Sequence, residues 1–134
     1  MLICPTNLVR LKLDAEKTIN TSGLLCKMID FTFSRMKTNK NEVICCDLEK
    51  EEWLFQGDET ISPQYEIYRK MRDITKGNWT DFKPETNILW LTYLAQYLGE
   101  RCEPFKPEAL EHIKRFKECD SVSQFEKKFS FKHI

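Results

Sequence analysis

The chain has 134 residues and a mass of 16.0 kDa, a length that suits one compact domain and excludes most two-domain enzymes. Its 21 basic and 21 acidic side chains cancel, so it lacks the basic excess that general nucleic-acid binding requires. Hydrophobic residues at 41% and charged residues at 31% are typical of a soluble globular protein rather than a disordered one.

The first third of the chain has strand-like patterns. Apolar and basic residues alternate over 8–13 (LVRLKL), which predicts a half-buried strand. A polar loop is expected over 14–23, and a second apolar run follows over 24–33 (LLCKMIDFTF). These two runs could pair as a hairpin with a long connection. After a turn at 37–41, the sequence VICC at 43–46 predicts a short buried strand.

The rest of the chain is patterned as helices. Apolar residues recur at helical spacing over 64–75, between Pro63 and Gly77, which predicts a helix with those bounds. Residues 86–98 are apolar on nearly every face, which predicts a core helix buried all round and ended by Gly99.

Two shorter helices are expected after the core helix. Pro107 opens the first, with Leu110 and Phe116 on its apolar face. Ser123 followed by Glu126 resembles a capping box at the start of the second. The predicted fold class is therefore α+β and mainly helical, with a small N-terminal β-hairpin and about four helices.

The sequence also bears on compartment. No apolar run approaches the ~20 residues that span a membrane, and the N-terminus lacks the basic and apolar regions of a signal peptide. Six irregularly spaced cysteines favour reduced, mostly buried thiols in an intracellular protein over a disulfide scaffold or a zinc site. Glycosylation sequons at 20–22 and 78–80 would then carry no meaning.

Two features admit both a structural and a functional interpretation. Residues 47–59, called here the acidic block, contain six acidic side chains and one basic, a local charge of −5. Such a run is either a solvated loop or a site for a basic peptide. Asp30 lies inside an apolar run, where a buried, unpartnered carboxylate is costly. It either caps a turn or serves a metal or catalytic role.

Several segments in order resemble haspin-type protein kinases. MIDFTFSRM at 28–36 is similar to the family's metal-binding segment, which has Asp-Tyr-Thr and then Leu-Ser-Arg where other kinases have Asp-Phe-Gly. The resemblance continues in the family's order through CD (46–47), LFQGD (54–58), QYEIYR (64–69) and NILWLTYL (87–94). It extends from about residue 8 to the end and implies that 1–134 is the C-terminal lobe of such a kinase.

The resemblance implies a nucleotide site. Asp30 would chelate the Mg²⁺ that bridges the ATP phosphates, since phosphoryl transfer needs a hard oxygen ligand beside the moving group. Asn7 would match the catalytic-loop asparagine, which is the other magnesium ligand. ATP and Mg²⁺ are therefore the implied cofactors, and a nuclear or chromosomal location is implied as well.

The resemblance also implies a role for the acidic block. Haspin-type kinases use acidic residues in this segment to hold the basic N-terminal tail of a histone. Glu51 and Asp58 match positions in that acidic surface, and Glu49 and Glu52 lie close by. Trp53 stands where the family has an acid, a departure that leaves the detailed substrate preference open.

Residues 1–134 contain no Gly-rich loop, no V-A-I-K segment and no His-x-Asp motif. We therefore expect that the N-terminal lobe and catalytic loop are missing and that this chain alone is inactive. One hypothesis is a part of a haspin-like serine/threonine kinase that phosphorylates a histone tail with ATP and Mg²⁺. The alternative is a non-catalytic, pseudokinase-like module that binds basic peptides through its acidic surface. Expected partners are a basic tail and a kinase N-terminal lobe, without membrane or direct nucleic-acid contact.

Overall fold

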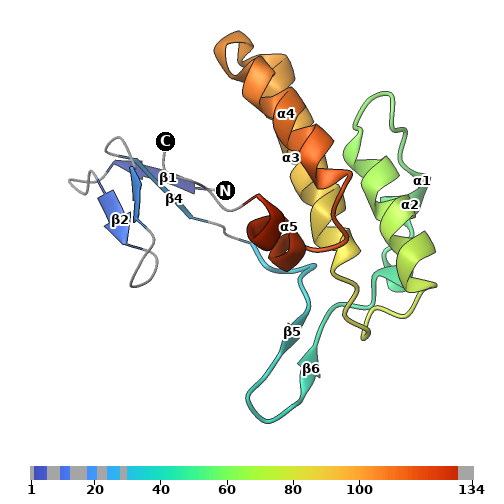
Figure 1. The fold of residues 1–134 in the computed structure, drawn as a ribbon. Helices are drawn as coiled ribbons and strands as arrows, with labels where there is room; N and C mark the ends of the chain where they lie inside the picture. Colours follow the sequence, from blue (N-terminus) through green and yellow to red (C-terminus); the bar gives the residue numbers. More distant parts are fainter. Residues whose placement is uncertain (1, 6–9, 13–17, 21–23, 28–29, 130–134) are drawn as a thin grey trace. The chain divides into compact units, whose positions relative to one another are not determined.

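The computed structural model describes residues 2–5, 10–12, 18–20, 24–27 and 30–129 (Figure 1). The chain divides into two compact units, 1–34 and 35–134. Within the described residues the first unit contains strands, and the second contains a small hairpin followed by helices.

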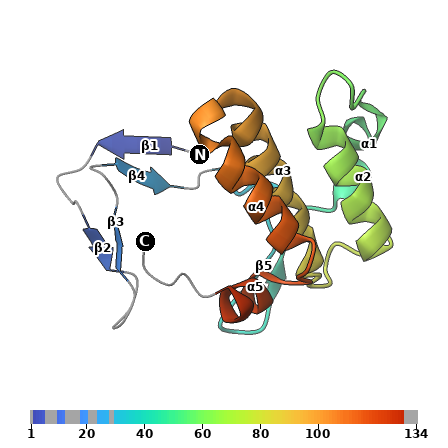
Figure 2. The same cartoon turned by 45° about the horizontal axis from the view of Figure 1, so that its top comes forward.

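The N-terminal unit contains two antiparallel strand pairs (Figure 2). β1 (Leu2–Pro5) pairs with β4 (Leu24–Lys27), and β2 (Arg10–Lys12) pairs with β3 (Thr18–Asn20). Each predicted apolar run contains a strand, but the predicted pairing between the two runs is wrong. The partner of β2 lies in the stretch expected to be a loop, where two β-branched residues favour a strand. A near partner also costs less loop-closure entropy than a distant one.

The second unit begins with a short hairpin of β5 (Met36–Lys37) and β6 (Val43–Ile44). Thr38 closes the turn, because its hydroxyl accepts hydrogen bonds from the backbone N–H groups of Lys40 and Glu42. The predicted turn is confirmed, and the predicted strand is present but shorter. The two residues of β6 are 40% and 54% exposed, so the prediction that this strand is buried is wrong. Strands of two residues present too little apolar surface to be covered by a second layer.

Four helices longer than one turn form the body of this unit among the described residues. They are α2 (Gln64–Thr75), α3 (Glu85–Arg101), α4 (Lys106–Phe116) and α5 (Val122–Lys128). α2 has the predicted bounds and ends where Lys76 and Gly77 adopt left-handed φ angles of 54° and 75°. A 3₁₀ turn, η2 (Glu103–Phe105), leads into α4. The α+β, mainly helical fold class is confirmed.

Gly99 does not end α3, which continues to Arg101. Gly99 is buried where α3 crosses α4, and a Cβ atom placed there would lie 2.7 Å from the Cβ of Ala109. The glycine therefore allows two helices to approach closely. This close packing outweighs the cost of about 1 kcal/mol that glycine imposes inside a helix.

The prediction that α3 is buried all round is also wrong. Ile88 and Ala95 are buried, whereas Leu94, Tyr97 and Leu98 are 45%, 38% and 41% exposed. α3 packs against α4 and against α2 (Figures 1 and 2), and these two helices cover only part of its circumference.

The last two helices confirm some predicted positions and correct others. Phe116 is buried as predicted, but Leu110 is 61% exposed and Ala109 takes the buried position instead. α5 is capped by Ser121, whose hydroxyl accepts a hydrogen bond from the N–H of Gln124 at 3.1 Å. The N-cap therefore lies two residues before the predicted one, because Ser121 has extended backbone and Ser123 is already helical.

The hydrophobic core joins α3, α4 and α5. Its buried residues are Ile88, Ala95, Phe116, Cys119 and Phe125. Cys119 is buried, Cys45 and Cys46 are half-buried and Cys102 is exposed, and these four cysteines are free thiols. Where helices are described, none is long and apolar enough to cross a membrane.

Replacing Gly99 with Ala should destabilise the fold. The added methyl group would collide with Ala109, and such overpacking costs about 1–3 kcal/mol, against a gain of about 1 kcal/mol in helix propensity. Gly99→Val should be worse, since it adds more volume. Urea denaturation followed by circular dichroism measures the change. Gln96→Ala, an exposed position in the same helix, is the control and should stay within about 0.5 kcal/mol. A rise in stability for Gly99→Ala would contradict the close crossing.

Candidate functional site

Asp30 forms a tight turn with the residues that follow it. Its carboxylate oxygen Oδ1 accepts hydrogen bonds from the backbone N–H of Thr32 at 3.3 Å and from the Thr32 hydroxyl at 2.6 Å. The backbone φ of Asp30 is 62°, a left-handed value that few residues other than glycine adopt. The Thr32 hydroxyl, and then the Thr32 backbone N–H, hold the pKa of Asp30 below its ordinary value. Asp30 is exposed and its carboxylate is ionised at neutral pH.

The same turn recurs at two other places in the chain. Asp58 accepts from the N–H and hydroxyl of Thr60 at 2.8 and 2.7 Å, and Asn78 accepts likewise from Thr80 at 3.2 and 2.6 Å. Each is an Asx residue followed two positions later by threonine. The turn-forming interpretation of Asp30 is therefore confirmed. The triplet at 78–80, noticed only as a sequon, is a structural turn as well.

Of the two predicted magnesium ligands, the structure describes only Asp30. Asn7 lies outside the described residues. Among the described residues, no group of three or more His, Cys, Asp or Glu side chains is placed to hold a metal ion. In the described part of the chain, Asp30 is thus a single exposed carboxylate whose oxygens can serve as metal ligands. That suits Mg²⁺ in nucleotide sites, where one or two carboxylates act together with phosphate oxygens.

The acidic block is folded into two helical turns rather than an irregular loop. They are η1 (Leu48–Lys50), capped by Asp47, and α1 (Trp53–Gln56). Leu48 and Leu54 are 2% and 0% exposed and are the largest fully buried side chains in the described part of the chain. Two buried leucines therefore anchor a segment whose charged side chains point into water.

Three of the predicted substrate-binding acids lie at the surface of the folded acidic block. Glu51 is half-buried, and its Oε2 accepts a hydrogen bond from the indole N–H of Trp53 at 2.9 Å. Glu52 is exposed, and its Oε2 accepts a hydrogen bond from the side-chain amide of Gln56 at 3.5 Å. Asp58 is exposed, and its pKa lies below the ordinary value, chiefly because the Thr60 hydroxyl donates to it. These carboxylates are held by short local contacts and keep access to water.

Two further acids of the block are engaged with the helical body. Glu49 accepts a hydrogen bond from the indole N–H of the buried Trp79 at 3.3 Å. Glu59 forms an ion pair with Arg69 of α2. Glu49, which was also predicted to bind substrate, is exposed, and one of its carboxylate oxygens accepts from Trp79.

Sequence reasoning missed the residues that hold this surface in place. The guanidinium carbon of Arg72 in α2 lies 4.3 Å from the ring centroid of Phe55. The ring of Phe55 stacks on that of Trp79, with ring centroids 6.3 Å apart. Arg35 donates to the backbone carbonyl of Thr80 at 2.7 Å, which ties the start of the hairpin to the same turn. Phe55 and Arg35 lie in segments that resemble haspin-type kinases, but the sequence did not show which residues they would contact.

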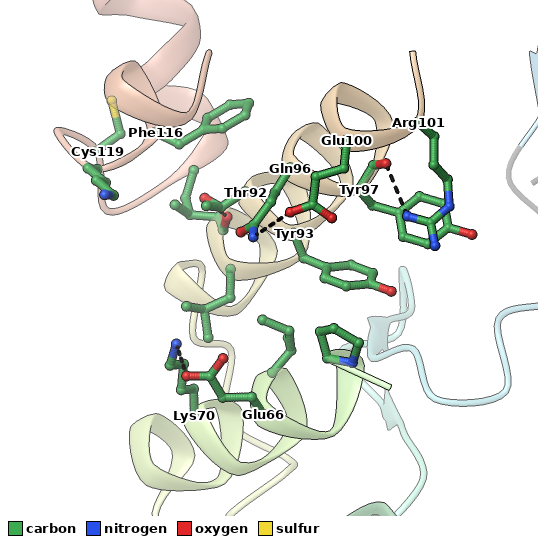
Figure 3. Close-up of a pocket in the computed structure, with 15 residues that line it drawn as sticks. Glu66, Lys70, Thr92, Tyr93, Gln96, Tyr97, Glu100, Arg101, Phe116 and Cys119 are labelled. Atoms are coloured by element: carbon green, nitrogen blue, oxygen red, sulfur yellow. Dashed lines mark hydrogen bonds and ion pairs between the residues drawn. The ribbon is translucent and has the colours of Figure 1, made fainter. Parts of the chain in front are cut away.

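A cavity of about 430 Å³ lies between α2, α3 and the end of α4. Figure 3 shows side chains from these helices facing it, with Phe116 and Cys119 on one side. The lining is mostly apolar. Two pairs of polar side chains in it already bind each other: Glu66 forms a salt bridge with Lys70 at 2.7 Å, and Gln96 donates a hydrogen bond to Glu100 at 3.0 Å. The cavity was not predicted from the sequence.

The fold and these motifs place the chain in a known family. The family model described as "Haspin like kinase domain" matches residues 10–133, so the chain belongs to the haspin-like kinase domain family. The resemblance seen in the sequence is thereby confirmed.

The chain is similar to haspin kinases of an insect, a mammal and a plant. "Serine/threonine-protein kinase haspin homolog" of Drosophila melanogaster is 42% identical over 80 residues, covering 58% of this chain and 13% of that protein. "Serine/threonine-protein kinase haspin" of Mus musculus is 40% identical over 97 residues, which cover 70% of this chain and 12% of that protein. The Arabidopsis thaliana haspin homolog is 33% identical over 111 residues, which cover 79% of this chain and 18% of that protein. The chain therefore spans less than a fifth of the length of these relatives.

Replacing Thr32 with Val should raise the pKa of Asp30 toward its ordinary value, because the hydroxyl donor that favours the carboxylate is removed. Carboxyl ¹³C chemical shifts followed against pH by NMR measure this change. A lowered native pKa stabilises the fold above the unfolded pKa, and the stabilisation is lost as the pH falls. The stability difference between wild type and Thr32→Val should therefore shrink as the pH falls through about 4.

The matched control is Thr86→Val, which removes a hydroxyl that donates to the carbonyl of Lys83 rather than to an acid. It should leave the pKa of Asp30 unchanged. Thr60→Val should raise the pKa of Asp58 alone. An unaltered pKa of Asp30 in Thr32→Val would contradict the turn geometry.

Proposed function

We propose that this chain is part of a haspin-like serine/threonine protein kinase that phosphorylates the basic tail of a histone with ATP and Mg²⁺. In this proposal the acidic block binds the tail, and Asp30 contributes a ligand to the magnesium ion. Family membership supports the reaction class, since its relatives are named serine/threonine-protein kinases. A nuclear or chromosomal location follows from the proposed substrate.

The observation that carries the proposal is the geometry of the acidic block. Glu51 and Glu52 lie between the two helical turns η1 and α1, and Asp58 follows α1, in a segment that two buried leucines fix to the body of the unit. Oriented carboxylates attract Arg and Lys side chains and select against acidic peptides. Their arrangement mainly adds steering and specificity, because each exposed ion pair contributes only about 0.2–1 kcal/mol.

Asp30 supports the nucleotide part of the proposal. An exposed, ionised carboxylate in a strained backbone conformation is a feature that often marks functional sites. Asn7 would be the second ligand. The bound Mg²⁺ would neutralise charge on the transferring phosphoryl group.

We further propose that residues 1–134 alone transfer phosphate poorly or not at all. Phosphoryl transfer depends on jointly positioned phosphate-binding, metal-binding and base residues. Of these, the sequence contains only the candidate magnesium ligands. A kinase N-terminal lobe is therefore a proposed partner.

A second candidate function is a non-catalytic module that binds basic peptides. One observation favours it. The contacts that hold Glu51, Glu52 and Asp58 all lie within the unit 35–134, which does not include Asp30. The peptide surface can therefore be presented independently of a nucleotide site.

Calorimetry with a short Arg- and Lys-rich peptide tests the surface shared by both functions. The chain should bind at low salt, and binding should weaken as salt screens the exposed charges. Glu51→Gln, Glu52→Gln and Asp58→Asn should each weaken binding by about 0.2–1 kcal/mol. Glu108→Gln, an exposed acid on α4, is the control and should have little effect. No measurable binding by the wild-type chain would exclude the acidic surface as a peptide site.

A phosphate-transfer assay separates the two functions. With labelled ATP, Mg²⁺ and a histone-tail peptide, the 134-residue chain should give no more product than an Asp30→Asn variant. Product that Asp30→Asn abolishes would show that the isolated chain is active. If a longer kinase containing these residues is used instead, Asp30→Asn should reduce turnover strongly. Unchanged turnover would leave only the binding function.

A further inference from the structure

Arg69 makes three contacts with the acidic block. It lies in the middle of α2, and its Nη1 donates hydrogen bonds to the backbone carbonyls of Phe55 and Gly57 at 3.1 and 3.0 Å. Its Nη2 forms the ion pair with Glu59. The side chain is 27% exposed, so these bonds are partly shielded from water.

The two carbonyls lie at the end of α1, a helix of a single turn. The last carbonyls of a helix have no intrahelical partner and need donors from elsewhere. A guanidinium group carries five N–H donors in a rigid planar fork, so one arginine can satisfy two carbonyls and a carboxylate together. Lysine has a compact ammonium group on a flexible stem and matches this geometry less well.

A second contact with α2 restricts the same backbone. The ring of Tyr65 packs against Gly57 so closely that a Cβ atom there would overlap it. Arg69 and Tyr65 together clamp the segment immediately before Asp58. The carbonyl of Asp58 in turn accepts hydrogen bonds from the N–H groups of Ile61 and Ser62, just before α2 begins.

We propose that Arg69 is a positioning residue of the peptide-binding surface. It fixes the backbone at the end of α1 so that Asp58 is held in its binding orientation. It also neutralises Glu59, so that this carboxylate takes no part in peptide binding. The inference rests on the proposed function, because it concerns the same surface.

Positioning and simple electrostatics predict opposite results. Removing Arg69 takes a positive charge away from an acidic surface and releases Glu59, so charge alone predicts tighter binding of a basic peptide. If Arg69 positions Asp58, its removal weakens binding despite the added negative charge. The sign of the change therefore distinguishes the two roles.

Calorimetry with the Arg- and Lys-rich peptide at low salt measures this sign for the full 134-residue chain. Arg69→Met should weaken binding by up to about fivefold, and no more than Asp58→Asn does, because Arg69 acts through Asp58. Arg69→Lys should fall between Arg69→Met and wild type. Lys70→Met, which removes an equal charge from the adjacent exposed position, is the matched control and should leave binding unchanged or slightly tighter.

Glu59→Gln tests the second half of the inference. It removes the ion pair and leaves both carbonyl hydrogen bonds of Arg69 in place, so peptide binding should stay close to that of wild type. Binding by Arg69→Met that equals or exceeds wild type would overturn the inference. So would a loss in Glu59→Gln as large as that in Asp58→Asn, because Glu59 would then contact the peptide directly.

Amide hydrogen exchange tests the positioning without any peptide. In Arg69→Met the N–H groups of Thr60 and Ser62, which donate to Asp58, should exchange faster, while those of α4 keep their wild-type rates. Unchanged exchange at Thr60 and Ser62 would overturn the inference even if the wild-type chain binds peptide. Faster exchange together with a wild-type chain that binds no peptide would support the clamp and exclude the proposed function.

Discussion

The burial of two leucines organises the surface on which the proposed function depends. Leu48 and Leu54 are the largest fully buried side chains in the described part of the chain, and both lie within a segment of charge −5. Fully burying a leucine contributes about 1.5–3 kcal/mol. Repulsion between exposed carboxylates is weaker and is screened over about 8 Å at physiological salt. Apolar burial therefore prevails, and the charged segment folds against the helices.

Once this segment is anchored, its acids divide into two groups. Glu49 and Glu59 contact Trp79 and Arg69 of the helical body. Glu51, Glu52 and Asp58 remain open to water with short local contacts. An acidic run in a sequence thus corresponds to a smaller set of carboxylates that can face a ligand. Residues of α2 and of the 78–80 turn decide which acids belong to that set.

The Asx-x-Thr turn links the two candidate parts of the site. Asp30 and Asp58 use one carboxylate oxygen to accept from a threonine two residues later. In both, the threonine hydroxyl lowers the pKa of the acid and favours its ionised form. In the proposed function, the same local chemistry prepares Asp30 for a metal ion and Asp58 for a basic side chain, while Asn78 uses it to shape a turn.

Sequence patterns correctly predicted the fold class, the bounds of α2 and the family, and they marked Asp30 and the acidic block as candidate site residues. Helical periodicity and ordered motifs depend on neighbouring residues, so they can be read along the chain. Only the tertiary structure decided the pairing of β2 with β3, the exposure of Leu110 and the role of Gly99. It also decided which acids contact the helical body and which have only local contacts. Each of these depends on a residue distant in sequence, such as Ala109 opposite Gly99 or Arg69 beside Glu59, and no local pattern specifies which distant residues will meet.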